Sequence, residues 1–337
     1  MRIAVFDVAA ESGGALSVLQ DFYNDFRNDP DNTYIFFVSK PELESCANID
    51  VLRYPWIKTS WLHRLYFDYF CAGRLSERHH ADQILSLQNV IVPFAKVPQT
   101  LYLHNSLPFV DYRFRLTENP LLWIYQNIIS RSIFASLRSA SHVIVQTKWM
   151  KAACVARLKI DPDKIEVRPP KIFVQAKTFF RYDETSRRTF FYPASAYVFK
   201  NHAIIIKACL NLKKRGIEDY KVILTIRGDE NKAVAELHQI VKKYDLPVDF
   251  LGPITRDEVF DLYTKTVLLF PSFVESSPLP LSEAMLHGGV ILASDYPFSR
   301  EVLTDYPNAR LFDPFNVENL ANELASSISG SLMYQQG

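Results

Sequence analysis

The 337-residue chain has little of several features that define whole classes of protein. Its four cysteines are scattered and form no Cys-x-x-Cys pair, which argues against a disulfide or zinc framework and favours reduced thiols. It has no apolar run of the length that a membrane-spanning helix requires. With 38 basic and 37 acidic residues it has no excess charge, so the composition gives no case for nucleic acid as the partner. The chain begins directly as a strand without a secretory leader, and we expect a cytoplasmic protein.

What the chain does have is enough apolar material for two domains. Its 48% hydrophobic and 22% charged residues are typical of soluble globular proteins, and its length is too great for one ordinary core. Short apolar segments alternate with amphipathic ones in each half, a pattern that predicts two parallel, doubly wound α/β sheets. We expect strands at 3–8, 34–38, 83–87, 100–103, 143–146, 190–193, 222–226, 248–251, 266–270 and 289–293. We expect helices at 15–27, 121–137, 201–214, 232–244, 256–263 and 317–327.

The two expected domains are separated by a stretch of different character. Residues 168–188 have a Pro-Pro pair, clustered charges and no stable period. We therefore expect an N-terminal Rossmann-like domain over residues 1–170, a linker over 171–188 and a C-terminal Rossmann-like domain over 189–337. Two such domains facing one another leave a cleft, which suits a ligand with two chemical ends.

The most informative segment is PSFVESSPLPLSEAMLHGGVILASD, residues 271–295. It lies between two apolar strands and sets Glu275 in a loop and Glu283 in a helix, so it predicts a βαβ unit with two acids at its open end. In open parallel sheets that edge, at the carboxyl ends of the strands, is where ligands bind. Taken alone, such a pair of glutamates is better explained as a helix-capping acid and a solvated acid.

The spacing of the surrounding residues closely resembles the paired-glutamate motif of retaining family 4 glycosyltransferases of the GT-B fold. The resemblance is strong over residues 190–303 and thin in the first half. It implies the GT-B architecture of two Rossmann-like domains facing across a cleft, with a nucleotide-diphosphate sugar as donor substrate and no cofactor. It also implies that Glu275 engages hydroxyls of the donor sugar and that Glu283 holds the nucleotide ribose. Carboxylates suit both roles because each accepts two hydroxyl hydrogen bonds.

Between the two acids the chain departs from the family pattern. Members usually have a Gly-aromatic-Gly stretch whose backbone amides cradle phosphate, whereas this chain has Ser276, Ser277 and Pro278. Because Pro278 has no N–H, we expect the amides of Ser277 and Leu279, with the helix start behind them, to bind the anion. No metal is expected, because the Asp-Pro-Asp strings at 29–31 and 161–163 read as polar turns.

A second constellation surrounds Lys200, at the expected start of a helix. A helix start already has partial positive charge, so an anion between the two would resolve an electrostatic conflict; an exposed lysine is the other interpretation. The position resembles the Gly-Arg-Leu-x-x-x-Lys element of the family, in which Arg and Lys grip the diphosphate. Lys200 matches the lysine, but Ser195 stands at the arginine position. We expect His202 to be a helix-start or packing residue.

Three further sites follow from the same resemblance. Gly13 and Gly14, after the first strand, would let the backbone approach the donor phosphate closely. His104, at the end of an expected strand, matches a histidine near the donor sugar and would be a positioning hydrogen-bond partner. Gly252 and Ile254 lie where backbone groups would meet the nucleobase.

The first half also has a surplus of aromatic residues, at 54–70 and 108–133, interleaved with Arg and Lys. We expect most of these rings to lie in the core or the cleft wall. The remainder would suit a surface that meets lipid headgroups or a lipid-linked acceptor. Such a peripheral contact would place the protein at the inner face of the cell membrane.

Together these features predict a metal-independent, retaining hexosyltransferase that moves a sugar to a glycan or lipid-linked glycan in surface polysaccharide synthesis. Lys200 and backbone amides would stabilise the leaving diphosphate, while Glu275 and His104 would fix the sugar. The alternative is a non-catalytic nucleotide-sugar-binding subunit of a glycosyltransferase complex, which Ser195, the Ser-Ser-Pro loop and the short segment after the last expected helix suggest. A nicotinamide oxidoreductase is disfavoured, because no Gly-x-Gly-x-x-Gly follows the first strand.

Overall fold

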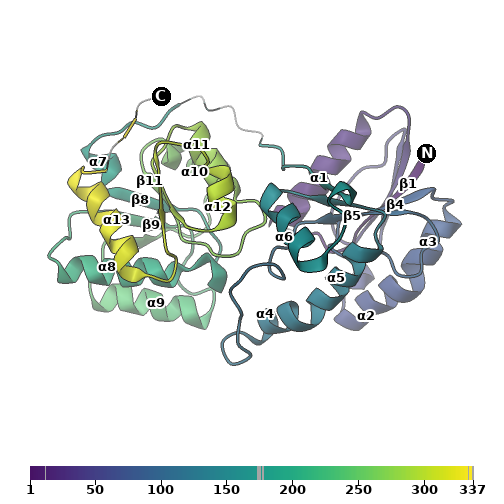
Figure 1. Cartoon of the computed structure of the whole chain (residues 1–337), viewed down its shortest axis with the longest axis horizontal. Helices are drawn as coiled ribbons and strands as arrows, with labels where there is room; N and C mark the ends of the chain where they lie inside the picture. The colour runs from purple at the N-terminus through teal and green to yellow at the C-terminus, as the bar shows by residue number, and fades with distance from the viewer. Residues whose placement is uncertain (12, 173–175, 177, 333, 336–337) are drawn as a thin grey trace. The chain divides into compact units, whose positions relative to one another are not determined.

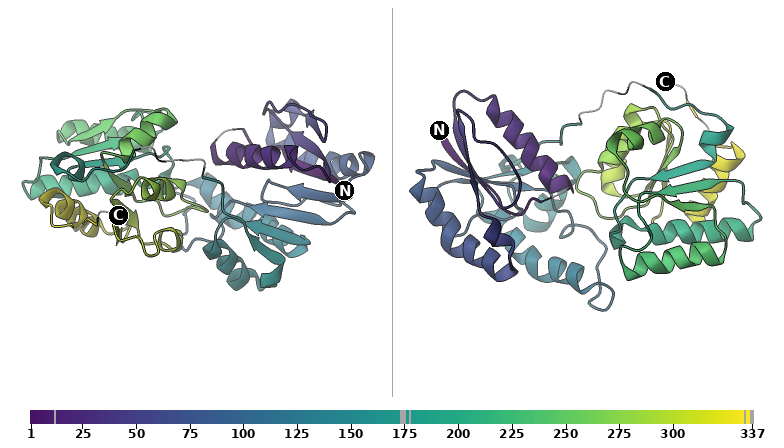
Figure 2. Two further views of the ribbon diagram at one scale, coloured as in Figure 1. Left: turned by 90° about the horizontal axis from the view of Figure 1, so that it is seen from above. Right: turned by 180° about the vertical axis from the view of Figure 1, so that it is seen from behind.

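The computed structural model describes residues 1–11, 13–172, 176, 178–332 and 334–335. They form two compact units, Met1–Lys171 and Ile172–Gly337. Each unit is built around its own parallel sheet, with helices on both faces (Figures 1 and 2). The predicted fold class of two doubly wound sheets is therefore confirmed.

The first unit has a seven-stranded sheet in the order β3-β2-β1-β4-β5-β6-β7, in which every strand pair is parallel. The strands are β1 (Arg2–Asp7), β2 (Thr33–Val38), β3 (Ile49–Arg53), β4 (Gln83–Ser86), β5 (Gln99–Leu103), β6 (His142–Val145) and β7 (Ile165–Val167). The helices are α1 (Gly13–Arg27), α2 (Trp61–Tyr66), α3 (Ala72–Arg78), α4 (Pro120–Ile124), α5 (Ser130–Ser139) and α6 (Lys148–Leu158). Single turns of π-helix, η2 (Phe67–Cys71) and η3 (Tyr125–Ile129), join α2 to α3 and α4 to α5, and short 3-10 turns are η1 (Pro55–Lys58) and η4 (Pro162–Lys164). The strand order reverses between β1 and β4.

The side chains of one strand alternate between the two faces of the first sheet, and each face has its own core. Tyr102 of β5 packs in the cluster that holds α1, whereas Leu101 and Leu103 pack in the cluster that holds α5 and α6. Phe6 of β1 packs with Phe67 of η2 on the face opposite α1. The helical segments 61–78 and 120–139 therefore cover the same face of the sheet.

The second unit has a six-stranded sheet in the order β10-β9-β8-β11-β12-β13. The strands are β8 (Thr189–Tyr192), β9 (Lys221–Leu224), β10 (Val248–Phe250), β11 (Val267–Phe270), β12 (Ile291–Ser294) and β13 (Ala309–Phe312). The helices are α7 (Glu184–Arg187), α8 (His202–Lys214), α9 (Lys232–Lys243), α10 (Arg256–Tyr263), α11 (Leu279–Leu286), α12 (Pro297–Val302) and α13 (Val317–Ser329), with a 3-10 turn η5 (Val198–Lys200). Here the order reverses between β8 and β11.

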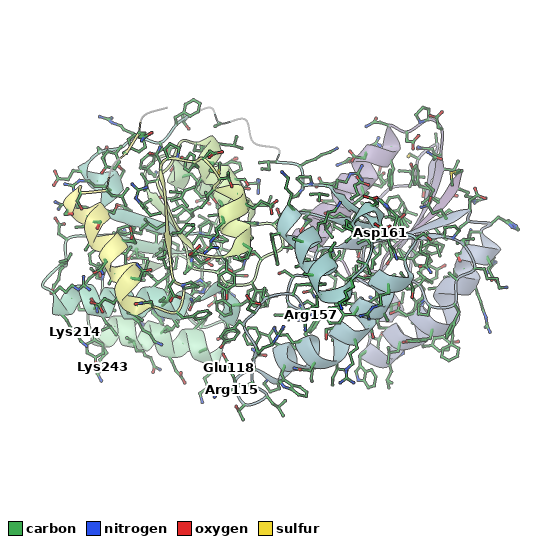
Figure 3. All side chains as sticks on the ribbon, viewed as in Figure 1. Arg115, Glu118, Arg157, Asp161, Lys214 and Lys243 are labelled. Atoms are coloured by element: carbon green, nitrogen blue, oxygen red, sulfur yellow. The ribbon has the colours of Figure 1, made fainter. Side chains whose placement is uncertain are left out.

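Local sequence explains these elements. The strands β11 and β12 are buried along their whole length and read as continuous apolar runs, as strands of covered parallel sheets do. Lys214 and Lys243 lie at the last turns of α8 and α9, where they complement the partial negative charge of the helix ends (Figure 3).

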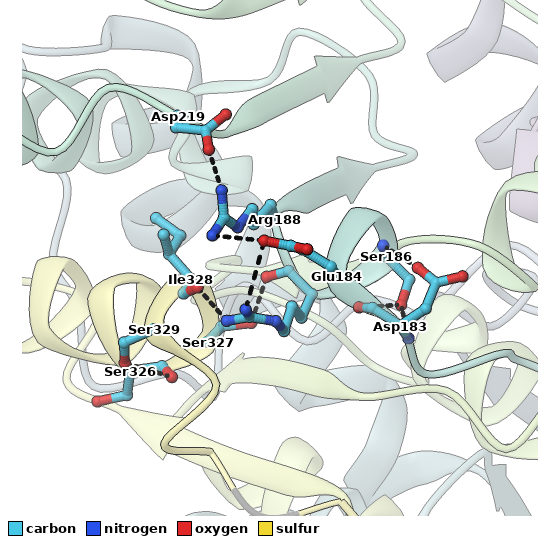
Figure 4. A network of polar contacts seen from close by, with 10 residues as sticks. Asp183, Glu184, Ser186, Arg188, Asp219, Ser326, Ser327, Ile328 and Ser329 are labelled. Carbon is cyan, nitrogen blue, oxygen red and sulfur yellow. Dashed lines mark hydrogen bonds and ion pairs between the residues drawn. The ribbon is translucent and has the colours of Figure 1, made fainter.

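The structure differs from the predicted linker, 171–188, in its second half. Asp183 caps α7 by accepting a hydrogen bond from the amide of Ser186 (2.8 Å). The hydroxyl of Ser327, on α13, donates to the carbonyl of Arg187 (2.7 Å), in the network of Figure 4. Polar capping residues gave this stretch the composition of a linker, but α7 is part of the second unit.

Two findings concern the expected surface of the first unit. Of the rings that we expect in the core or the cleft wall, few of those in residues 54–70 lie in the core: Phe67 is buried, and five others are exposed, Trp56, Trp61, Tyr66, Tyr69 and Phe70. In the second aromatic stretch, Phe109 and Phe114 are buried. Within the described part of the chain, every helix is too short or too polar to cross a bilayer.

Candidate functional site

The centre of the candidate site is an ion pair between Lys200 and Glu275. Lys200 ends the loop after β8, and Glu275 lies in the loop after β11, so the two meet where the strand order of the second sheet reverses. The Lys200 Nζ atom lies 2.5 Å from Oε1 of Glu275, and the two side chains are 19% and 14% exposed. Open parallel sheets bind ligands at this reversal point, in the crevice outside the carboxyl ends of the strands.

The backbone around Lys200 is fixed on several sides. The hydroxyl of the buried Tyr192 donates to the Lys200 carbonyl (2.9 Å), and the amide of Phe273 donates to the carbonyl of Phe199 (3.1 Å). Asn201 adopts a left-handed conformation with φ of 60°, which asparagine tolerates better than most residues, and its side chain donates to the carbonyl of Pro314 (2.8 Å). The position of the Lys200 backbone is therefore fixed by hydrogen bonds from neighbouring elements. A cation at a helix start is electrostatically unfavourable, and the carboxylate of Glu275 compensates this charge.

Glu283 is deeply buried and bound at both oxygens. It lies on α11, and its side chain is 5% exposed. Oε1 accepts a hydrogen bond from Arg256 (2.7 Å), and Oε2 accepts one from the hydroxyl of Tyr263 (3.1 Å). Burial and the neighbouring Glu283 carboxylate raise the pKa of Tyr263 well above its ordinary value, so this hydroxyl stays protonated and donates. Both predicted glutamates thus face partners inside the second unit and not bulk water.

Arg256 and Tyr263 are absent from the sequence-based site. A signal for Arg256 existed, because it is a cation at the first position of a helix, the same feature that singled out Lys200. Tyr263 gave no signal, since a tyrosine near the end of an amphipathic helix reads as a core residue.

A pocket of about 420 Å³ opens at the carboxyl ends of three neighbouring strands, β8, β9 and β10. Its volume lies within the range of about 300–1,000 Å³ that is typical of ligand pockets. The predicted residues Ser195 and Ile254 both line it. So do Arg227 and Glu230, which are absent from the sequence-based site. The loop over residues 193–201 thus lines the pocket with its first half and carries Lys200 in its second.

Two predicted backbone contacts have local structural explanations. Gly252 has a φ of 76°, and its amide donates to the carbonyl of Ile226 (3.1 Å), so glycine is required there by backbone conformation. The amide of Leu279 donates to the carbonyl of Ser277 (3.1 Å) at the start of α11. An anion bound at Leu279 would have to replace this hydrogen bond.

The predicted residues of the first unit lie at the carboxyl ends of its strands. His104 follows β5, and Asn89, which follows β4, fixes it in two ways. The Asn89 side-chain oxygen accepts the His104 amide hydrogen (2.8 Å), and Asn89 Nδ2 lies 3.0 Å from His104 Nε2. Because an amide nitrogen only donates, Nε2 is the acceptor and the ring proton is on Nδ1. Burial lowers the pKa of His104 to about 4, so the ring is neutral near pH 7.

Gly13 and Gly14 open α1, directly after the loop that follows β1. Gly13 has a φ of 60°, whereas Gly14 does not have a positive φ. A Cβ atom added at either glycine would meet no heavy atom within 4 Å. Neither backbone conformation nor packing therefore requires a glycine at position 14, and the space beside it is open.

His202 is the packing residue that the sequence predicts. It is buried against the ring of Tyr192, with ring centroids 5.1 Å apart. Burial, helped by the nearby Lys200 charge, lowers its pKa to about 4. Among the described residues, no three His, Cys, Asp or Glu side chains gather closely enough to hold a metal ion.

Two parallel doubly wound sheets, with a polar site at the carboxyl edge of the second, define the GT-B class of architecture. Residues 175–336 match the model of the family described as glycosyl transferases group 1. The second unit is therefore a group 1 glycosyl transferase domain, and the chain has the GT-B fold.

Known proteins similar to this chain agree with that class. The chain is 24% identical to the O-antigen chain mannosyltransferase RfbU of Salmonella typhimurium over 254 residues, which are 74% of this chain and 67% of that protein. Among solved structures, sucrose-phosphate synthase from Thermosynechococcus elongatus has a TM-score of 0.72 at 16% identity, covering 97% of this chain and 90% of its own. Anabaena HepE in complex with UDP and glucose has a TM-score of 0.69 at 18% identity, with 98% and 90% covered. The lipopolysaccharide outer core galactosyltransferase WaaB has a TM-score of 0.67 at 17% identity, with 99% and 92% covered.

Proposed function

We propose that the chain is a retaining, metal-independent hexosyltransferase. It moves a sugar from a nucleotide-diphosphate donor to a glycan or lipid-linked glycan acceptor in the synthesis of a surface polysaccharide. The family match of the second unit supports glycosyl transfer. The similarity to RfbU, an O-antigen chain mannosyltransferase, and to WaaB, a lipopolysaccharide outer core galactosyltransferase, supports the kind of product.

One observation carries the proposal: a lysine–carboxylate pair lies at the strand-order reversal, on the same loop that lines a ligand-sized pocket. The pocket accommodates the nucleoside, in contact with Ser195 and Ile254. Lys200 then lies on the path toward the diphosphate and Glu275 toward the sugar hydroxyls. HepE supports a nucleotide-sugar as ligand, because it has been solved in complex with UDP and with UDP-glucose.

In this proposal the residues act by electrostatics and positioning. Lys200 stabilises the charge that develops on the leaving diphosphate, an effect whose loss typically costs about 10²–10³ in rate. Glu283 holds the ribose, and its orientation is set by Arg256 and Tyr263. His104, which is neutral near pH 7, is the residue of the first unit to which we assign the positioning of the sugar.

The test uses the purified chain with a panel of UDP-, GDP- and dTDP-hexoses. A thermal-shift screen identifies the donor, since a ligand that binds the folded state raises the apparent stability by mass action. Nucleotide release with and without a glycan acceptor, in the presence of EDTA, then measures donor hydrolysis and transfer. Transfer that retains the anomeric configuration, detected by NMR of the product, supports the proposal.

The rival is a non-catalytic nucleotide-sugar-binding subunit. It is favoured by Ser195, which stands where the resemblance expects an arginine. This rival predicts a donor-induced thermal shift without nucleotide release under any acceptor condition. That result would replace the transferase proposal.

A further inference from the structure

The helical segment 61–78 of the first unit exposes an apolar stripe to solvent. Its inner side packs on the sheet through Phe67 and Ala72. Its outer side carries six large apolar or aromatic side chains, each between 42% and 69% exposed: Trp61, Leu62, Leu65, Tyr66, Tyr69 and Phe70. They recur in pairs at intervals of four residues, so they line up along one side of the helix. We call these six residues the outer stripe.

Ring contacts extend the outer stripe to two neighbours, Trp56 and Phe94. Tyr66 and Phe70 are stacked with ring centroids 5.5 Å apart, and Trp56 lies 6.3 Å from Tyr66. On the other side Tyr69 lies 6.2 Å from Phe94, a loop residue that is 81% exposed. Single exposed apolar residues are ordinary, but a contiguous patch marks an interaction surface.

The same side of the helix continues into basic residues. Arg74 and Arg78 follow Tyr66 and Phe70 at intervals of four, and both are exposed. The neighbouring acids are already paired, Asp68 with Arg64 (2.6 Å) and Glu77 with Lys96 (3.0 Å).

A second helical segment, residues 120–139, repeats this design. Leu121, Ile124 and Ile128 are exposed at helical spacing in its first turns. Arg131 and Arg138 are exposed in its last turns. Both segments contain one π turn, η2 and η3, and both cover the same face of the sheet. Apolar first turns followed by exposed arginines are thus a shared property of this face.

We propose that the outer stripe, with Arg74 and Arg78, docks the first unit on an anionic lipid bilayer. The rings and leucines enter the boundary between headgroups and acyl chains, and the arginines reach the lipid phosphates. Aromatic rings combined with basic side chains fit this boundary, where one end of a side chain meets hydrocarbon and the other meets charge and water. The inference deepens the proposed transfer to a lipid-linked acceptor by naming the surface that meets the lipid, but the lipid contact is measurable without any sugar.

The test is co-sedimentation of the full chain with two kinds of vesicle. One is phosphatidylcholine alone, and the other contains about 30 mol% phosphatidylglycerol, which gives it an anionic surface. We expect binding to the anionic vesicles and a blue shift of tryptophan fluorescence that Trp61→Phe diminishes. The double variant Trp61→Ser/Phe70→Ser should lose binding. Arg74→Gln/Arg78→Gln should lower the partition coefficient about 25-fold, because each arginine near an anionic surface contributes about a fivefold gain.

Matched controls are available in the second unit. Phe179→Ser changes a ring that is 67% exposed, close to the 58% of Phe70, and Arg181→Gln changes an arginine whose side chain is 87% exposed. Both should bind vesicles like the parent. All these positions are exposed, so each variant should keep the melting temperature of the parent.

Three outcomes would overturn the lipid inference. They are a parent chain that does not bind anionic vesicles, outer-stripe variants that bind like the parent, or a parent dimer that Trp61→Ser/Phe70→Ser converts to a monomer. The last outcome would assign the stripe to a second copy of the chain. Donor-dependent nucleotide release by the same variants separates this failure from failure of the proposed function, because the donor pocket lies in the other unit.

Discussion

Lys200 and Glu275 are 75 positions apart in the chain, yet the Lys200 ammonium donates a hydrogen bond of 2.5 Å to the Glu275 carboxylate. The pair lies where the strand order of the second sheet reverses. Each satisfies the charge of the other in a region that is largely shielded from water. In the function that we propose, an approaching diphosphate would meet a cation that already has a partner. Glu275 would then become free to accept hydrogen bonds from sugar hydroxyls as Lys200 turned to the phosphates.

Lys200→Ala should lower turnover by about 10²–10³-fold, because a preorganised positive charge on the leaving group is lost. Donor affinity should fall much less, since the pocket at the ends of β8, β9 and β10 is untouched. Steady-state nucleotide release gives the first quantity and calorimetry the second. Lys207→Ala, at an exposed position on α8, is the matched control. Parent-like turnover of the Lys200 variant would remove the lysine from the mechanism.

Glu283→Ala should weaken nucleotide-sugar binding, because the ribose loses its acceptor and Arg256 and Tyr263 lose the group that they orient. The buried Tyr263 hydroxyl is left without this partner, which should also cost about 1–3 kcal/mol of stability. Calorimetric titration with the donor, beside urea unfolding, measures both effects. Glu236→Ala, on the exposed side of α9, should change neither. An unaltered dissociation constant for the Glu283 variant would show that the ribose binds elsewhere.

The neighbouring glycines of α1 should respond differently to alanine. Gly13→Ala forces a side chain into φ of 60° and should destabilise the chain by about 1–2 kcal/mol. Gly14→Ala adds a methyl group to open space without a positive φ, so stability should be kept. If the donor phosphate approaches this backbone, Gly14→Ala should nevertheless reduce donor use. A Gly14 variant with both parent-like stability and parent-like activity would exclude close approach.

Asp7, at the end of β1, should make the stability of the first unit depend on pH. Burial raises its pKa to about 7, against hydrogen bonding to Ala10 and the charge of Arg64, which lower it. The protonated form is therefore favoured in the folded state, and the stability from this group is complete below about pH 4 and lost as the pH rises through 7. Asp7→Asn keeps a neutral side chain at every pH, so its advantage over the parent should grow between pH 5 and pH 8. Urea midpoints at both values measure it; an equal difference at the two pH values would contradict the prediction.

The sequence predicts the central strands well and the edge strands poorly. The three strands that it misses, β3, β7 and β13, all lie at sheet edges. Central strands such as β11 are covered on both faces and so consist of apolar residues alone. An edge strand is partly exposed, as β13 is, and its mixed composition gives neither a continuous apolar run nor clear alternation.

The helical segment 61–78 is missed for a related reason. Helix prediction assumes that the apolar side faces the core, but here large apolar residues occupy the outer side as well. Aromatic residues on both sides remove the contrast on which the 3.6-residue period depends. The same property that hides this helix in the sequence is the one that makes its surface informative in the structure.

The sequence identifies individual residues of the candidate site but not the contacts between them. Lys200 conflicts with its own helix start, and the two glutamates stand in a motif with strict spacing, so all three are identifiable. That Lys200 and Glu275 bind each other depends on which two loops the strand order brings together, and strand order is not readable from local pattern. The bonds of Arg256 and Tyr263 to Glu283 depend likewise on how α10 packs beside α11.

The loop over residues 193–201 has a consequence for how donors are told apart. One end of this loop lines the pocket that we propose for the nucleoside. The other end, which carries Lys200, is fixed by the hydrogen bonds of Tyr192 and Asn201. A base or sugar of the wrong shape would displace the part of the loop that lines the pocket. This displacement would move Lys200 away from the phosphates. Poor substrates would then be held almost as firmly as good ones but converted slowly, so discrimination would show in kcat rather than in affinity.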